Sequence, residues 1–188
     1  MTTMHTVLIA NRGEIALRVI RGCRKLGLRS VAIHTDLDIT APPVREADEA
    51  ISLGTATFVD PGDGTRRSRY LDEAAVIAAL RGADVDAAWV GWGFLAEHAS
   101  FAQACEEAGI VFVGPDSATI RRLGDKVAAK RLAEQADVPV VPWSGGPVGD
   151  VAAATAIAAQ LGYPLVVKAS AGGGGRGRGR VAPVSLRV

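Results

Sequence analysis

The feature that most constrains this chain is the alternation of short apolar runs with segments of helical periodicity through its first ~115 residues. The runs predicted to be strands span residues 6–10, 30–34, 50–53, 87–90 and 110–113. The segments predicted to be helices between them span residues 14–26, 71–80 and 101–108. Strands that are separated by helices pair in parallel through right-handed crossovers. We therefore expect residues 1–115 to form an α/β domain with a doubly wound, Rossmann-like parallel sheet.

The first helix illustrates the pattern. Ile15, Val19, Cys23 and Leu26 recur at helical spacing and predict one apolar face. Gly27 follows the last of them, and glycine is the residue that most often ends a helix.

Beyond Gly114-Pro115 the rhythm changes. Helices are predicted at residues 117–123, 125–136 and 151–161, with Asp125 as an N-cap, a loop at 138–149 and one strand at 164–169. A single strand with these helices cannot cover both faces of a sheet. Residues 116–177 are therefore predicted to begin an incomplete α+β unit.

Composition excludes several classes of function. Lysine and arginine number 21 against 20 acidic residues, so the net charge of +1 gives no general attraction to nucleic acid or to a membrane. No apolar run approaches the ~20 residues that span a bilayer, and the N-terminus lacks the pattern of a signal peptide. Cys23 and Cys105 have no metal-like spacing, which predicts packing roles in a reducing cytoplasm and no metal site.

Four places carry candidate chemistry. The first is the turn Asn11-Arg12-Gly13-Glu14, where a helix follows a strand and its free N–H groups could face an anion. The pattern G-x-G-x-x-G is absent, so a plain tight turn is an equal alternative.

The second place is the stretch from Gly91 to Glu97, at the carboxyl end of a predicted strand, where α/β folds bind ligands. Gly91 and Gly93 allow a bound group to approach Trp92, and Glu97 adds a carboxylate. The alternative is that Trp92 and Phe94 simply fill the core.

The third place is Lys126, in the first turn of a predicted helix, where its charge opposes the helix dipole unless it meets an anion such as phosphate. A surface lysine without function is the alternative.

The fourth place follows Lys168, which ends an apolar strand. The glycines that come next can bring successive N–H groups onto an anion, and they are Gly172, Gly173, Gly174 and Gly175. The lysine precedes the glycines, which distinguishes the stretch from a Walker loop. A flexible Gly/Arg linker is the alternative, but it leaves the adjoining strand and lysine unexplained.

Six motifs occur in an order that resembles the N-terminal part of biotin carboxylase, the ATP-grasp component of biotin-dependent acyl-CoA carboxylases. They are VLIANRGEIALRVIR (7–21), VREADEA (44–50), GFLAEHASFA (93–102), FVGP (112–115), GDKVAAK (124–130) and KASAGGGGRG (168–177). The resemblance covers residues 7–177, nearly the whole chain.

The resemblance implies an ATP-dependent ligase that phosphorylates bicarbonate with Mg-ATP and carboxylates biotin on a carrier domain. It implies that Lys126, Lys168 and the glycines 172–175 contact ATP. It further implies that Trp92, Gly93 and Glu97 lie at the edge of the biotin pocket. The expected partners are the biotin carboxyl carrier domain and a carboxyltransferase, with no nucleic acid or membrane.

Two departures from the family pattern bear on function. Two segments resemble the corresponding parts of the large multidomain acetyl-CoA carboxylases of fatty acid biosynthesis, namely Trp89–Glu97 and residues 141–145 (VPWSG). After Gly177 the chain reads RGRVAP where the family continues R-G-M-[RK]-V-V, so residues 178–188 are predicted to be an atypical tail, possibly out of frame. The Mg²⁺ ligands and catalytic residues of the family are expected downstream, so the isolated polypeptide is predicted not to turn over.

Three other hypotheses compete. One is another ATP-grasp ligase of the carbamoyl-phosphate or purine-carboxylating type, which shares the glycine loop but not N-R-G-E-I-A or G-F-L-x-E. Another is an RNA-binding protein with an Arg-Gly tail, although its arginines are few and no aromatic residues lie between them. The last is a non-catalytic assembly subunit that docks to a complete carboxylase.

Overall fold

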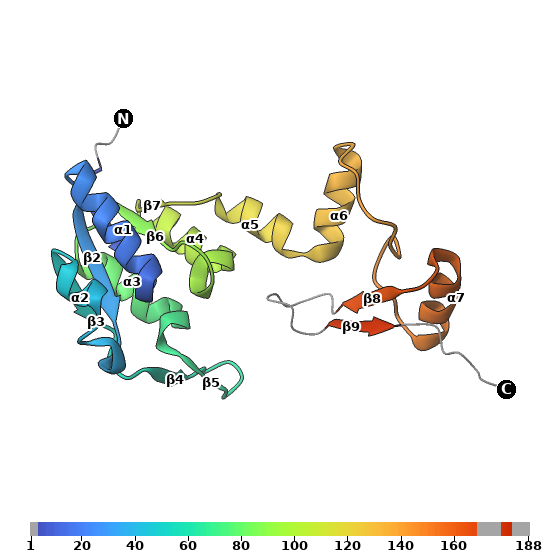
Figure 1. Cartoon of the computed structure of the whole chain (residues 1–188), viewed down its shortest axis with the longest axis horizontal. Helices are drawn as coiled ribbons and strands as arrows, with labels where there is room; N and C mark the ends of the chain where they lie inside the picture. The colour runs from blue at the N-terminus through green and yellow to red at the C-terminus, as the bar shows by residue number, and fades with distance from the viewer. Residues whose placement is uncertain (1–3, 169–177, 182–188) are drawn as a thin grey trace. The chain divides into compact units, whose positions relative to one another are not determined.

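The computed structural model describes residues 4–168 and 178–181 (Figure 1). The chain divides into two compact units, Met1–Arg121 and Arg122–Val188. The predicted glycine loop lies outside the described residues, as do residues 182–188 of the predicted tail.

A parallel five-stranded sheet organises the first unit. Its strands are β1 (Thr6–Ile9), β2 (Arg29–His34), β3 (Glu49–Ser52), β6 (Ala87–Trp89) and β7 (Val111–Phe112). Their order is β3-β2-β1-β6-β7, with β1 in the centre, where Val7 is in register with both Ser30 and Ala87. All four pairings are parallel, as the alternation of strands and helices predicts.

Helices cover both faces of this sheet, and side chains alternate between them along β1. On one face Val7 and Ile9 pack with Ala16, Ile20 and Cys23 of α1 (Gly13–Leu26). On the other, Leu8 lies in a second core cluster with residues of α3 (Glu73–Gly82) and α4 (Ala99–Glu107). The short helix α2 (Pro42–Glu46) precedes β3. The doubly wound fold is thereby confirmed.

The buried stripe of α1 differs from the predicted one. Ala16, Ile20 and Cys23 are buried, whereas Leu26 is 75% exposed. Residues 16, 20 and 23 follow the i, i+4, i+7 spacing of a single helix face, and Leu26 lies to its side. Gly27 ends the helix in a left-handed conformation (φ 69°), as expected.

A β-hairpin between β3 and α3 was not predicted. Strands β4 (Thr57–Val59) and β5 (Arg66–Ser68) pair antiparallel around a turn in which Gly62 N donates to Asp60 Oδ1. The residues that indicate it are Pro61, Gly62 and Gly64, all of them turn formers. Three single-turn 3₁₀ segments complete the unit, at Asp36–Asp38, Arg69–Leu71 and Phe94–Glu97.

Helix α5 (Ser117–Gly124) runs across the boundary between the units. The second unit then contains α6 (Lys126–Gln135), α7 (Val151–Leu161), β8 (Leu165–Lys168) and β9 (Arg178–Val181). Strands β8 and β9 form an antiparallel pair in which Lys168 is in register with Arg178. Part of the segment predicted to be an atypical tail is therefore strand β9.

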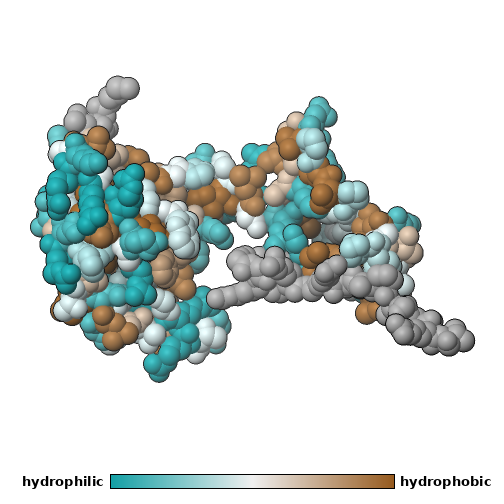
Figure 2. Space-filling model, viewed as in Figure 1, coloured by the Kyte–Doolittle hydropathy of each residue, from teal (hydrophilic) through white to brown (hydrophobic). Residues whose placement is uncertain are grey.

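The apolar composition of residues 164–169 predicts a buried strand, but β8 is exposed in the part of the chain that the structure describes. Val166 and Val167 are 57% and 58% exposed. Within the described residues β8 pairs with β9 alone, so no further strand adjoins it. Hydrophobic residues are accordingly visible at the surface of this unit in Figure 2.

Candidate functional site

The strand order places a topological switch point between β1 and β6. From β1 the chain continues to β2 and β3 on one side of the sheet, and β6 and β7 then occupy the other side. Crevices at the carboxyl ends of strands that flank a switch point are the usual ligand sites of open α/β sheets. The two turns that meet there, after β1 and after β6, carry Asn11–Glu14 and Gly91–Gly93.

Asn11 links these two turns. Its side chain is 1% exposed, and Nδ2 donates to Val90 O at 2.8 Å and to Trp92 O at 3.1 Å. Its Oδ1 accepts from Arg12 N at 2.8 Å, so the buried amide is satisfied at both ends. Sequence reasoning missed this role because it considered the turn for anion binding through its backbone.

Arg12 extends the same turn toward β2. Its guanidinium donates to Asp38 Oδ1 at 2.7 Å and lies 5.7 Å from the centre of the Tyr70 ring. Tyr70 is buried and its hydroxyl donates to Asp38 Oδ2 at 2.9 Å. Burial, followed by the hydrogen bond to Asp38, raises the pKa of the Tyr70 hydroxyl, so this residue stays a neutral donor.

A cavity of about 420 Å³ lies where the two turns meet. Its lining consists of Asn11, Arg12, Gly13, Glu14, Ile15, Trp92, Gly93 and Phe94. Trp92 is 69% exposed, so it does not fill the core. Phe94 is half-buried and packs against the core and against Tyr70, with ring centres 5.4 Å apart.

Backbone conformation and steric space explain why glycine stands on each side of Trp92. Gly91 and Gly93 have φ angles of 67° and 72°, in the left-handed region. A Cβ on Gly91 would also lie 2.4 Å from the Trp89 ring, too close for any side chain. Glu97 is exposed in the 3₁₀ turn Phe94–Glu97 and does not line the cavity. The structure therefore brings Trp92 and Gly93 together with the first turn, but not Glu97.

Lys126 is the first residue of α6 and is half-buried. Asp125 caps the helix as predicted, because its Oδ1 accepts from Val127 N at 2.8 Å and Ala128 N at 2.7 Å. The cap leaves the lysine in the first turn, where the positive end of the helix dipole favours an anion beside it.

Lys168 is the last residue of β8 and is exposed. Gly172, Gly173, Gly174 and Gly175, predicted to contact ATP, lie outside the described residues. The structure thus gives positions for both candidate lysines, and the contact of the glycine loop with ATP stays a prediction from the sequence.

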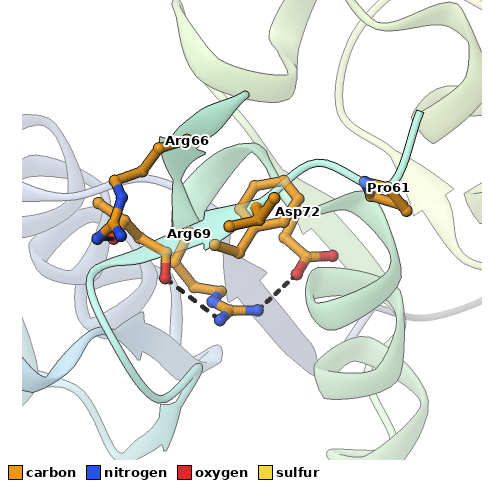
Figure 3. A pocket seen from close by; sticks show the side chains of 7 residues that line it. Pro61, Arg66, Arg69 and Asp72 are labelled. Carbon is orange, nitrogen blue, oxygen red and sulfur yellow. Dashed lines mark hydrogen bonds and ion pairs between the residues drawn. The ribbon is translucent and has the colours of Figure 1, made fainter. Parts of the chain in front are cut away.

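A second cavity, of about 570 Å³, adjoins the unpredicted hairpin (Figure 3). Arg69 lines it, and its guanidinium donates from Nη1 to Asp72 Oδ2 at 2.7 Å and lies 5.3 Å from the centre of the Phe58 ring. Arg67 pairs with Asp60 and Asp63. These arginines therefore stabilise the hairpin and are already neutralised.

Within residues 4–168 and 178–181, no three His, Cys, Asp or Glu side chains are grouped so as to hold a metal ion. The described carboxylates thus do not form a Mg²⁺ site. In the same part of the chain, no helix has the length and apolar character needed to cross a membrane.

Comparisons with known proteins agree with the resemblance seen in the sequence. The family model for the biotin carboxylase N-terminal domain matches residues 3–120, and that for the ATP-binding domain of the carbamoyl-phosphate synthase L chain matches residues 125–185. The chain is 46% identical over 171 residues to the biotin carboxylase of Pseudomonas aeruginosa, covering 90% of this chain and 36% of that protein. It is 43% identical to the human mitochondrial propionyl-CoA carboxylase alpha chain, covering 91% of this chain and 22% of that one.

Solved structures give the same result. A Campylobacter jejuni biotin carboxylase complex with β,γ-ATP superposes with a TM-score of 0.86 at 36% identity, over 96% of this chain and 39% of that one. A second structure is the biotin carboxylase domain of Hydrogenobacter thermophilus 2-oxoglutarate carboxylase, solved with MgADP, ADP and bicarbonate. It superposes with a TM-score of 0.84 at 43% identity, over 97% of this chain and 38% of that one. The chain thus spans about a third of the length of the biotin carboxylases it matches. With the N-terminal family model covering more than half of its residues, the chain belongs to the biotin carboxylase family.

Proposed function

We propose that this chain supplies the switch-point edge and part of the nucleotide site of a biotin carboxylase, which carboxylates biotin with bicarbonate and ATP. The observation that carries the proposal is the capped lysine at the start of α6, inside a segment that matches an ATP-binding domain. The relatives with solved nucleotide complexes superpose over nearly all of the chain.

In this proposal Lys126 and Lys168 neutralise the phosphate oxygens of ATP, and the backbone N–H groups of Gly172 to Gly175 surround the same phosphates. Bound Mg-ATP supplies the γ-phosphoryl group that activates bicarbonate. The lysines hold that group in place and stabilise its charge, which is most of what a protein contributes to phosphoryl transfer. The Mg²⁺ ligands come from residues other than those the structure describes.

At the switch point, Trp92 and Gly93 form the edge of the biotin pocket, and Glu97, exposed outside the cavity, extends the proposed edge from the adjoining 3₁₀ turn. Trp92 is exposed beside a cavity, and the bare backbone of Gly93 lets a ring approach closely. The partners proposed with this edge are a biotin carboxyl carrier domain, which presents biotin, and a carboxyltransferase, which uses the product.

For the acyl acceptor we propose the acetyl-CoA type, on the two segments Trp89–Glu97 and residues 141–145. The matched relatives include a propionyl-CoA and a 2-oxoglutarate carboxylase, so this choice rests on the segments alone. Reconstitution with a carboxyltransferase and parallel assays on acetyl-CoA and propionyl-CoA test it. A preference for propionyl-CoA contradicts it. The two unpaired cysteines suit the reducing cytoplasm that we propose as the location.

A hybrid enzyme tests the proposed activity. Residues 7–168 replace the aligned residues of the Pseudomonas aeruginosa relative, and bicarbonate-dependent ATP hydrolysis with biotin is measured. We expect turnover, and a loss of about tenfold or more in kcat/KM for ATP in Lys126→Met, because a hydrogen bond to a charged group contributes about 1.5–3 kcal/mol. Lys25→Met, an exposed lysine in the last turn of α1, is the matched control and should leave kcat/KM unchanged.

Two results contradict the proposal: a folded hybrid without bicarbonate-dependent turnover, or a Lys126→Met hybrid as active as the control. The polypeptide of residues 1–188 is proposed not to turn over, because the described carboxylates form no metal site. The same ATPase assay on that polypeptide tests this, and steady-state hydrolysis above the no-enzyme rate contradicts it.

A further inference from the structure

The turn after β6 is held from its inner side by one side chain. The carbonyl oxygens of Val90 and Trp92 both converge on Asn11 Nδ2, at 2.8 and 3.1 Å. The residue between them, Gly91, has a φ of 67°, which reverses the chain so that both oxygens can point the same way.

The other side of the turn is closed by Trp89, whose ring leaves no space for a Cβ at Gly91. Ala10 N also donates to Trp89 O at 2.8 Å, so the ends of β1 and β6 are joined up to the point where the turn begins. From there the Asn11 amide continues the link. Because it fixes the backbone of Trp92, it also fixes where the exposed indole and Gly93 stand at the cavity.

We propose that Asn11 is a positioning residue for the Trp92–Gly93 edge and acts through the backbone of Trp92. The inference rests on the biotin role proposed for that edge, and it adds a residue outside the edge that determines its shape. The amide N–H₂ group of Asn11 carries two hydrogens and can therefore donate to both carbonyls, which a hydroxyl or a carboxylate cannot do. Asn11→Asp is nearly the same size but presents an oxygen to them, and Asn11→Ala leaves them without a donor.

Asp86 provides a matched control at the opposite, amino-terminal end of the same two strands. Its Oδ2 accepts from His5 N at 2.7 Å and Thr6 N at 2.8 Å, so it ties β6 to the start of β1 with two backbone hydrogen bonds. Asp86→Asn weakens a link of the same kind between the same two strands, but away from the cavity. A loss of general stability should therefore appear in both variants, and a loss of positioning only in the Asn11 variants.

The first measurement is amide hydrogen exchange on the full 188-residue chain. Ala96 N donates to Gly93 O at 2.9 Å and so reports on the turn. We expect about tenfold faster exchange at Ala96 in Asn11→Ala and Asn11→Asp, because the turn loses the two hydrogen bonds that Asn11 Nδ2 donates to it. In Asp86→Asn the faster exchange should appear at His5 and Thr6 instead. Equal acceleration throughout the sheet in the Asn11 variants, or unchanged exchange at Ala96, overturns the inference.

The second measurement compares two ligands on the same chain, in a Trp143→Phe background that keeps Trp89 against the turn and leaves exposed Trp92 as the tryptophan most accessible to iodide. Protection of Trp92 fluorescence from iodide reports the affinity for biotinyl-lysine, and titration calorimetry reports the affinity for Mg-ATP. We expect the affinity for biotinyl-lysine to fall about tenfold or more in Asn11→Ala with the affinity for Mg-ATP unchanged. An equal fall for both ligands, or no fall for either, overturns the inference.

The two proposals fail in different ways. If the parent chain shows no protection by biotinyl-lysine, the biotin role of Trp92 fails, and exchange at Ala96 alone decides whether Asn11 positions the turn. If the parent is protected and Asn11→Ala is protected equally, the biotin role stands and the positioning role is lost. If Asn11→Ala does not fold, Asn11→Asp with Asp86→Asn as its control carries both measurements.

Discussion

The indole of Trp143 donates a hydrogen bond from Nε1 to Glu134 Oε1 at 2.6 Å, joining the loop before α7 to the last turn of α6. Lys130, one turn earlier, places its ammonium 5.1 Å from the centre of the same ring. Arg131 NH2 also donates to Gly145 O at 3.2 Å. This loop, whose sequence alone predicts only an irregular connection, is thus tied to the helix that begins with Lys126.

Replacing Trp143 should release the loop. Trp143→Ala removes a hydrogen bond to a charged group and a cation–π contact, which together contribute about 1–3 kcal/mol at a partly exposed site. We expect faster proteolysis within residues 138–149, measured by the rate of cleavage under native conditions. Trp143→Phe keeps a ring near Lys130 and should show an intermediate rate. Cleavage at the parent rate in Trp143→Ala would show that the loop is held by other contacts.

The cap of α6 gives a second prediction. Asp125→Ala should lower the free energy of unfolding of the second unit by about 1 kcal/mol, because Val127 N and Ala128 N lose their acceptor. Asp125→Asn retains a side-chain oxygen as acceptor and should lower the free energy of unfolding by only about a few tenths of a kcal/mol. Urea unfolding followed by tryptophan fluorescence, in a Trp89→Phe/Trp92→Phe background that leaves Trp143 alone, measures both. A larger loss of unfolding free energy in Asp125→Asn than in Asp125→Ala would mean that the charge of Asp125, and not its capping hydrogen bonds, is the main contribution.

How far the fold follows from the sequence can be seen along α1. Its bounds and its glycine end were predictable because they depend on local periodicity and on the conformation of Gly27. The side of the apolar stripe that faces the sheet was not predictable, because Ile15, Val19 and Leu26 are as apolar as Ile20. The buried face, Ala16, Ile20 and Cys23, depends on packing between α1 and the sheet, which the sequence of the helix alone does not contain.

The candidate site shows the same division. Trp92 and Gly93 were predicted as site residues from their place after a strand, and Lys126 from its helix position, since both features depend on local order. Asn11 was missed as a link because its partners lie 79 and 81 residues away. The exposure of β8 was also missed, since burial depends on which elements adjoin a strand and not on its own residues.

The rotation of α1 can be tested by a pair of substitutions. Ile20→Ala should lower the free energy of unfolding by about 2–5 kcal/mol, because it leaves a cavity in a fully buried site. Leu26→Ala, on the predicted face but 75% exposed, should change it by no more than about 0.5 kcal/mol. Chemical unfolding followed by circular dichroism compares them. Equal losses would place the buried stripe where the sequence alone predicted it.

Acid should destabilise the first unit through two carboxylates. Hydrogen bonds from the Ser30 amide and hydroxyl hold the pKa of Asp48 below its ordinary value of 3.8, and those from the His5 and Thr6 amides do so for Asp86. A lowered pKa in the folded state means that the unfolded state binds more protons. The stabilisation is therefore complete above pH 3.8 and is lost as pH falls through the lower folded values.

The double variant Asp48→Asn/Asp86→Asn tests this account. Its free energy of unfolding should be lower than that of the parent at pH 6, and the two should converge as pH is reduced below about 4. Urea unfolding at a series of pH values gives both curves. A constant difference across the whole range would show that the two carboxylates contribute through packing and not through their charge.

Both thiols should be inert in the folded protein. Cys105 is fully buried among the core residues of α4, and desolvation raises its pKa to about 11. Burial also raises the pKa of Cys23, which packs between α1 and the sheet. Because the thiolate is the reactive form, a disulfide reagent at pH 8 should modify neither until the first unit unfolds. The rate of modification in urea should therefore follow the loss of circular dichroism, with Cys105→Ala reporting Cys23 alone. Rapid modification of either thiol in the native protein, with the circular dichroism unchanged, would show that the helix carrying it opens independently of the sheet.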